Sequence, residues 1–273
     1  MVRVGVVWDR TAAFVGERMA ALVPIALITL VVPNAITGVL EPVRLTAPLG
    51  TRALLGLVMI VAGLAAMWGQ LSITALVVEP GETVGGALRE GRRRLPAMIG
   101  VSLALLLAFI ILSLPFSFIL YAAGLASMDM AGMQAVATGA WRGRILIGVL
   151  IAAVVLLWLS ARLSVLMPVV VAERRGLRAI PRAFSLTRGL GLKMAAVILL
   201  YLVVLSIASY ATTTVFGTVL MLIAGGEGPI TVASVLTAVA VSVVTAIFVV
   251  IASVFVAQLY RALRSLYEGA PAA

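Results

Sequence analysis

The stretches VSLALLLAFIILSLPFSFIL (residues 101–120) and ILIGVLIAAVVLLWL (residues 145–159) decide the fold class of this chain. Neither contains a charged residue, and neither alternates between apolar and polar residues as a strand of an outer-membrane barrel does. Backbone groups within hydrocarbon must form their hydrogen bonds inside the segment, as they do in a helix. Both stretches therefore predict membrane-spanning helices.

Six segments are long enough to span a membrane. A spanning helix needs about 20 mostly apolar residues, because about 30 Å of hydrocarbon is crossed at about 1.5 Å per residue. The segments are residues 19–40, 53–78, 95–125, 145–172, 194–224 and 230–257. The first is expected to be retained rather than cleaved as a signal peptide, because charges at Asp9, Arg10, Glu17 and Arg18 interrupt the preceding apolar run. The sequence predicts an all-α integral membrane protein with six transmembrane helices as three hairpins.

The composition excludes several kinds of chemistry. Of the 273 residues, 63% are hydrophobic and 11% charged, whereas a soluble domain has about 45–50% apolar and about 25% charged residues. The chain has no histidine and no cysteine, which excludes disulfides, a thiol nucleophile, a Cys/His zinc site and a Ser-His-Asp triad. We find no catalytic constellation, and we expect a non-enzymatic protein without a metal or cofactor.

The basic residues predict the orientation, because Lys and Arg near the ends of spans mark the cytoplasmic side. With the N-terminus inside, fifteen of the 20 basic residues lie before span one, after spans two and four, and after span six. Only Arg44, Arg52, Arg142 and Arg144 fall on the other side, and Arg162 lies within span four. We expect a multi-pass protein of the bacterial inner (plasma) membrane with both termini in the cytoplasm. Topology thus accounts for the net charge of +10 without a nucleic-acid partner.

Three similar tetrapeptides suggest an internal repeat. They are GQLS at 69–72, ARLS at 161–164 and AQLY at 257–260, near the cytoplasmic ends of the even-numbered spans. An amphipathic segment precedes each pair of spans, so the expected unit is an interfacial helix followed by a hairpin. The units are residues 1–80, 81–172 and 173–265 of one membrane domain. The alternative is that such short matches arise by chance in apolar sequence.

Arg162 is the most informative single position. It precedes the cytoplasmic end of span four by about ten residues, or about 15 Å in a continuous helix, and a charge at such depth costs about 2.5–3.5 kcal/mol on insertion scales. It either binds an anionic ligand or headgroup, or it plays a structural role, capping carbonyls or pairing with Glu79 or Glu173. These two carboxylates end their spans where the helix dipole disfavours anions, so we expect structural ion pairs with arginines of the adjacent interfacial helices.

Two basic segments border the expected inner leaflet. The residues in these segments that are candidates for binding lipid headgroups are Arg92, Arg93, Arg174, Arg178 and Arg182. A basic residue beside an anionic membrane surface contributes about 1 kcal/mol to binding. The alternative is that these charges serve only to set the topology.

The segment ARLSVLMPVVVAERRGLRAIPRAFSLTRG (residues 161–189) resembles the membrane domain associated with glycerophosphoryl diester phosphodiesterases. The resemblance rests on Arg162, Pro168, Glu173, Gly176, Ala179, Arg182, Ser185 and Gly189. It implies a six-helix membrane module, which in some relatives is fused to a catalytic barrel. The apolar spans leave no room here for a barrel of about 250 residues. The resemblance therefore implies the membrane module alone, without phosphodiesterase activity.

The sequence favours a non-enzymatic inner-membrane module that binds anionic lipid, or scaffolds a membrane-protein partner, through its basic cytoplasmic face. The alternative is a small transporter or channel with a polar path around Gln70, Arg162 and Gln258. A water-filled cavity reaching Arg162 would favour transport, whereas a packed bundle with basic residues open to the inner leaflet would favour lipid binding.

Overall fold

The computed structural model describes residues 3–79, 81–122, 142–224 and 230–269, and this part of the chain is helical without any strand. Its elements, in chain order, are α1 (Val4–Glu17), α2 (Met19–Ala26), the π-helix η1 (Leu27–Val31), α3 (Val32–Thr46), α4 (Leu49–Val78), α5 (Val84–Ala122), α7 (Arg142–Leu163), α8 (Leu166–Ala172), α9 (Ala179–Leu186), α10 (Gly191–Ala224) and α11 (Val232–Glu268). Six helical stretches are long and apolar enough to cross a membrane. The predicted all-α, multi-pass architecture is therefore confirmed, although the last residues of expected span three (95–125) lie outside the described ranges.

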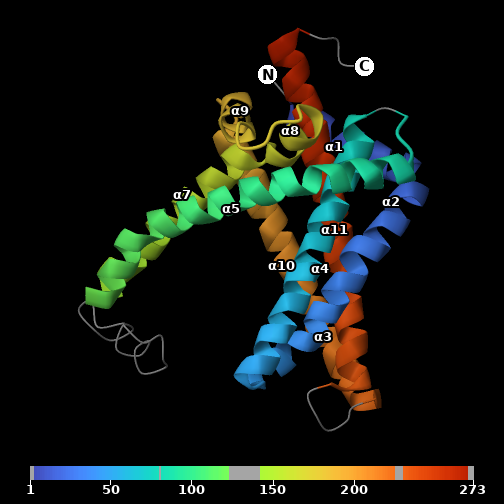
Figure 1. Cartoon of the computed structure of the whole chain (residues 1–273), viewed down its shortest axis with the longest axis vertical. Coiled ribbons are helices and arrows are strands. Elements are labelled where there is room, and N and C mark those ends of the chain that lie inside the picture. The colour runs from blue at the N-terminus through green and yellow to red at the C-terminus, as the bar shows by residue number, and fades with distance from the viewer. Residues whose placement is uncertain (1–2, 80, 123–141, 225–229, 270–273) are drawn as a thin grey trace.

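Both ends of the chain lie at the same end of the molecule, together with α1, α8 and α9 (Figure 1). We call this the basic end, because it also carries the start of α5 with Arg92 and Arg93 and the loop around α9 with Arg174 and Arg178. The turn between α3 and α4 lies at the opposite end. Two segments far apart in sequence thus place their arginines at one end of the bundle.

The spans pack unevenly. α10, α11, α3 and α4 run side by side, whereas α5 and α7 lean away from them in Figure 1. α5 packs on α4, and α7 packs on α10. The fully buried side chains gather near the basic end, for example Leu71 of α4, Val169 of α8 and Leu259 of α11. Burial of apolar side chains drives packing where water is near, but not where lipid surrounds the helices.

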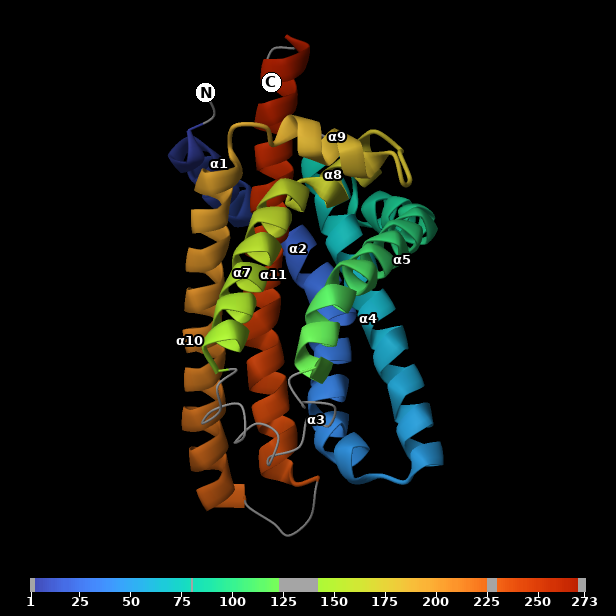
Figure 2. The ribbon, with the colours of Figure 1, turned by 90° about the vertical axis from the view of Figure 1, so that its left-hand side faces the viewer.

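A proline breaks span four. α7 ends at Leu163 and α8 begins at Leu166, because in a continuous helix the ring of Pro168 would clash with the carbonyl of Ser164, four residues earlier. α8 then turns aside from α7 (Figure 2). Arg162 is consequently the next-to-last residue of α7, and the depth of about 15 Å that assumed an unbroken helix does not apply.

The interfacial helix expected before span three is not a separate element. α5 runs without interruption from Val84 through Pro96 to Ala122. Before span one, by contrast, a turn at Arg18 separates α1 from α2, and residues 187–190 separate α9 from α10. Two of the three expected units therefore have a distinct helix before their hairpin, and the middle unit has one continuous helix.

The GQLS tetrapeptide of α4 is a close-packing element. A Cβ atom built on Gly69 would contact Thr29 Oγ1 and lie 2.7 Å from Thr29 Cβ, in η1. One turn later Ser72 is fully buried, and a Cβ built on Gly91 of α5 would lie 3.0 Å from the Ser72 backbone nitrogen. Small residues let helix backbones approach closely within a membrane. These positions bring η1, α4 and α5 together.

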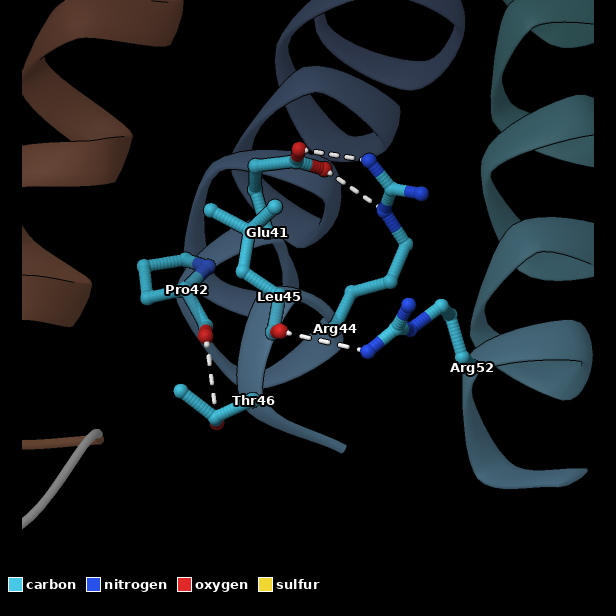
Figure 3. A network of polar contacts seen from close by, with 6 residues as sticks. All are labelled: Glu41, Pro42, Arg44, Leu45, Thr46 and Arg52. Carbon is cyan, nitrogen blue, oxygen red and sulfur yellow. Dashed lines mark hydrogen bonds and ion pairs between the residues drawn. The ribbon is translucent and has the colours of Figure 1, made fainter. Parts of the chain in front are cut away.

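At the end opposite the basic end, arginines tie the α3–α4 turn together (Figure 3). Arg44 donates two hydrogen bonds to the Glu41 carboxylate, at 2.7 and 3.0 Å. Arg52, in the first turn of α4, donates to the carbonyls of Leu45 and Ala47 at 3.4 and 3.2 Å. Arg52 thus satisfies carbonyls at the end of α3 that have no intrahelical partner.

Candidate functional site

Glu173 joins three elements at the basic end. Its carboxylate, with a side chain only 9% exposed, accepts hydrogen bonds from Arg182 Nε of α9 at 3.0 Å and from Tyr260 Oη of α11 at 3.3 Å. Arg175 Nε lies 3.1 Å from its second oxygen. Glu173 follows α8 directly, so its carboxylate connects α8, α9 and α11. This is the ion pair with an adjacent interfacial helix that the sequence predicted.

The local sequence explains how α9 presents Arg182. Ala179, Ala183 and Leu186 are spaced four and three residues apart and are buried, so they form the face that packs on the protein. Arg182 is the residue before Ala183, so it lies beside this buried face, and its side chain extends towards Glu173. Between α8 and α9 the chain reverses through Arg174, whose φ is +54°. Such left-handed backbone is uncommon for a residue with a side chain.

Arg162 lies where α7, α9 and α10 meet. Its guanidinium carbon lies 5.5 Å from the centre of the Trp158 ring, within cation–π range. Its backbone carbonyl accepts a hydrogen bond from Thr187 Oγ1 at 3.1 Å. Its Nε is buried and has no hydrogen-bond partner among the described residues, and a Cβ built on Gly191, the first residue of α10, would lie 3.7 Å from it. Arg162 thus has a structural role, through the hydrogen bond from Thr187 to its carbonyl, and its side chain also offers an unused N–H donor beside the start of α10.

The structure separates the predicted lipid ligands into two groups. Arg182 is engaged by Glu173, with its side chain 26% exposed. Arg92, Arg93, Arg174 and Arg178 are exposed, and none of the described ion pairs includes them. The first group holds the fold together, whereas the second leaves its charges at the surface of the basic end.

Glu79 does not form the ion pair expected of it within the described part of the chain. Its neighbours at the start of α5 are acidic, because Glu82 and Glu90 both lie close to it. Glu90 itself pairs with Arg94 one turn later, at 2.7 Å. Burial raises the pKa of the Glu79 carboxyl, a side-chain hydrogen bond with Glu82 and repulsion from Glu82 and Glu90 raise it further, and Arg174 opposes this rise. A carboxylate at the end of α4 is therefore left among like charges.

This environment predicts that Glu79→Gln increases stability at neutral pH. The folded-state pKa of Glu79 lies above its unfolded value, so the folded state binds the proton more tightly and loses stability as the pH rises from the unfolded through the folded pKa. Glutamine removes this loss and should leave stability unchanged near pH 4, about where the carboxyl is protonated in either state. Thermal unfolding in detergent between about pH 4 and 8 measures the difference. Exposed Glu17→Gln is the control, and an unaltered pH dependence in Glu79→Gln would contradict the prediction.

The polar path expected around Gln70, Arg162 and Gln258 stays a hypothesis. Gln258 is 7% exposed and packed within the core. One cavity lies between α3, α10 and α11, and none of the three residues is among its described lining. The tetrapeptides instead place a buried small residue at their first position, namely Gly69, Ala161 and Ala257.

Several connecting residues were missed from sequence. Trp68 Nε1 of α4 donates to the Leu88 carbonyl of α5 at 2.8 Å. Arg261 of α11 donates to the Val77 carbonyl at 3.4 Å, at the end of α4. Tyr260 contacts Glu173 from 87 residues away in sequence. The AQLY tetrapeptide drew attention to Tyr260, but the neighbouring sequence does not indicate that Tyr260 contacts Glu173.

Comparison with known proteins adds no further assignment. No family model matches the chain, and no similar protein is found among curated proteins or solved structures. The resemblance of residues 161–189 to the phosphodiesterase-associated membrane domain therefore stays a hypothesis. Function has to be argued from the geometry of the basic end.

Proposed function

We propose that this chain is a non-enzymatic module of a bacterial inner membrane that binds anionic phospholipid headgroups at its basic end. The observation that carries the proposal is the buried, unpartnered Nε of Arg162 beside the first residue of α10. A buried donor without a partner costs about 1–3 kcal/mol, and more on a charged group. A phosphate oxygen is a strong acceptor for a guanidinium.

The start of α10 favours the same ligand. The first N–H groups of a helix have no intrahelical acceptor, and the helix dipole adds positive potential there. Arg188 and Lys193 flank this start and are exposed. One phosphate at this place would accept hydrogen bonds from backbone and side chain together.

The contrast between the two ends supports the proposed orientation. At the opposite end, Arg44 and Arg52 are occupied by Glu41 and by backbone carbonyls. At the basic end, Arg92, Arg93, Arg174 and Arg178 remain exposed, and each contributes about 1 kcal/mol beside anionic lipid. We therefore propose that the basic end faces the cytoplasmic leaflet.

Native mass spectrometry of the protein in nanodiscs tests the proposal. With equal amounts of phosphatidylglycerol and phosphatidylcholine, we expect one phosphatidylglycerol to be retained preferentially. Arg162→Gln should weaken its retention about tenfold, since a hydrogen bond to a charged group contributes about 1.5–3 kcal/mol. Arg52→Gln, an arginine at the opposite end, is the matched control and should have no effect.

Salt separates specific binding from general attraction. Screened surface charges lose most of their attraction at about 0.5 M salt, where the Debye length is about 4 Å. We expect the Arg162-dependent lipid to persist at that concentration, while Arg92→Gln/Arg93→Gln weakens binding only at low salt. Equal retention of both lipids, or no effect of Arg162→Gln in a folded protein, would overturn the proposal.

Two further expectations from the sequence, a membrane-protein partner and membership of the resembled family, are compatible with this proposal. A headgroup site of this kind could present a partner protein to the membrane. Membership of the phosphodiesterase-associated membrane domain family would suit a module without a reaction of its own. Both the partner role and the family membership stay hypotheses. The measurement of lipid binding comes before any test of them.

A further inference from the structure

A cavity of about 620 Å³ lies between α3, α10 and α11, in the half of the bundle away from the basic end. Among the described residues, its lining is rich in hydroxyl groups and contains no charged residue. The polar residues around it are Asn34, Thr213, Thr231, Ser234, Thr237, Ser242 and Thr245. The remaining lining residues are small or apolar. Gly217 of α10 leaves ordinary contact distance to α11, whereas Gly38 of α3 packs closely on it, since a Cβ built on Gly38 would lie 3.3 Å from Ala238 Cβ.

The hydroxyls of α11 follow one face of the helix. They start at Thr231, the N-cap residue, and recur down to Thr245, fourteen residues later. At about 1.5 Å per residue this polar face extends about 21 Å into the span. Beyond it, Ala246, Val250 and Val254 are buried. The cavity therefore does not continue along α11 beyond Thr245, and it is open to the outside where Gly38, Thr213 and Met221 are exposed.

The hydrogen bonds already made determine what the cavity offers. Thr213, Thr237 and Ser242 each donate their hydroxyl proton to the backbone carbonyl four residues earlier, at 2.9, 2.7 and 2.7 Å. Each oxygen keeps lone pairs that accept hydrogen bonds. The Asn34 amide, which can both donate and accept, has no hydrogen bond within the described part of the chain. The walls thus present several acceptors and one amide.

These groups select the chemistry of an occupant. An ion would find no opposite charge among the lining residues, and a lipid tail would leave Asn34 without a partner in an apolar surrounding, which is costly. A neutral molecule with several hydroxyl groups donates to the acceptors and pairs with the amide. We infer that this cavity binds a neutral polyol, either free or as the uncharged headgroup of a glycolipid.

The proposal is independent of the anionic lipid site, because it concerns different helices and uncharged groups. The test variant is Thr237→Val/Ser242→Ala, which removes two hydroxyls from the lining with little change in volume. Its matched control is Thr212→Val. Thr212 also donates to a carbonyl four residues earlier, at 2.7 Å, and is next to Thr213 but is not among the lining residues.

A second variant blocks the space. A side chain at Gly217 would extend towards Thr237, since a Cβ built there lies 3.7 Å from Thr237 Cγ2. Gly217→Leu should therefore fill part of the cavity while keeping the hydroxyls. Thermal unfolding of every variant in detergent confirms that each is folded before binding is measured.

Three probes, measured by two methods, distinguish the sources of the polyol. Saturation-transfer NMR in glycerol-free buffer measures binding of glycerol and inositol, and native mass spectrometry in nanodiscs measures retention of monoglucosyl diacylglycerol against phosphatidylcholine. We expect at least one probe to bind, with about tenfold weaker binding in Thr237→Val/Ser242→Ala and in Gly217→Leu, and no change in Thr212→Val. Absence of binding by all three probes would overturn the inference, as would an equal loss in Thr212→Val.

Discussion

Glu173→Gln is expected to lower the free energy of unfolding by about 3 kcal/mol, at the lower end of the range for breaking a buried ion pair. The substitution removes the charge that holds Arg182, with its side chain 26% exposed, and weakens the contact with Tyr260. Arg175 is half exposed and regains water, which keeps the loss near 3 rather than 5 kcal/mol. The free energy of unfolding is measured by chemical denaturation in mixed micelles, with tryptophan fluorescence as the signal.

The matched control is Glu41→Gln at the opposite end. Glu41 pairs with Arg44 as closely as Glu173 pairs with Arg182, but its side chain is 43% exposed. An exposed pair contributes little, because water screens it and the side chains lose entropy in forming it. We expect almost no change in stability. Equal losses in the two variants would show that burial of Glu173 among three elements is not what makes it important.

Gly69→Val is the second large effect, with an expected loss of about 1–3 kcal/mol from overpacking. Any side chain at position 69 meets Thr29 of η1, whose Cβ would lie 2.7 Å from the new Cβ. The contact joins two rigid helical segments, so the helices must separate to relieve it. Thermal unfolding in detergent should show a lower midpoint, and Thr29→Gly should restore part of it, since neighbouring substitutions couple.

Gly63→Ala on the same helix is the control for the glycine itself. A Cβ built on Gly63 has no neighbouring atom within 4 Å. Alanine is favoured over glycine inside a helix by about 0.5–1 kcal/mol, so this variant should be slightly more stable than the parent. Destabilisation by Gly63→Ala to the same extent as by Gly69→Val would show that contact with Thr29 is not the cause.

The six spans were predictable because hydropathy is a sum over neighbouring residues. Expected spans 53–78 and 194–224 correspond closely to α4 (Leu49–Val78) and α10 (Gly191–Ala224), whereas α5 begins well before expected span 95–125 and α11 continues well past expected span 230–257. The break in span four was less accessible. Pro168 was visible in sequence, yet prolines also occur in continuous spanning helices such as α5, which contains Pro96 and Pro115.

The two span-ending carboxylates show where prediction of the site stopped. Glu79 and Glu173 occupy similar places at the ends of α4 and α8, and sequence predicted an arginine partner for each. Among the described residues only Glu173 has one, because α9 turns Arg182 towards it. Beside Glu79 lie Glu82, in the connection before α5, and Glu90 of α5. The difference depends on the rotation of each following helix about its axis, which composition does not specify.

By itself, the sequence determined the class of protein, the number of spans and the asymmetry of its charge. These are local properties, because each residue contributes its transfer free energy or its charge wherever its neighbours lie. Only the tertiary structure decided that Arg162 ends α7 beside α10, that Tyr260 reaches Glu173, and that hydroxyls of α11 line a cavity with Asn34. Such contacts depend on helix breaks and rotations set by packing between segments far apart in the chain, where a shift of one residue turns a side chain by about 100°.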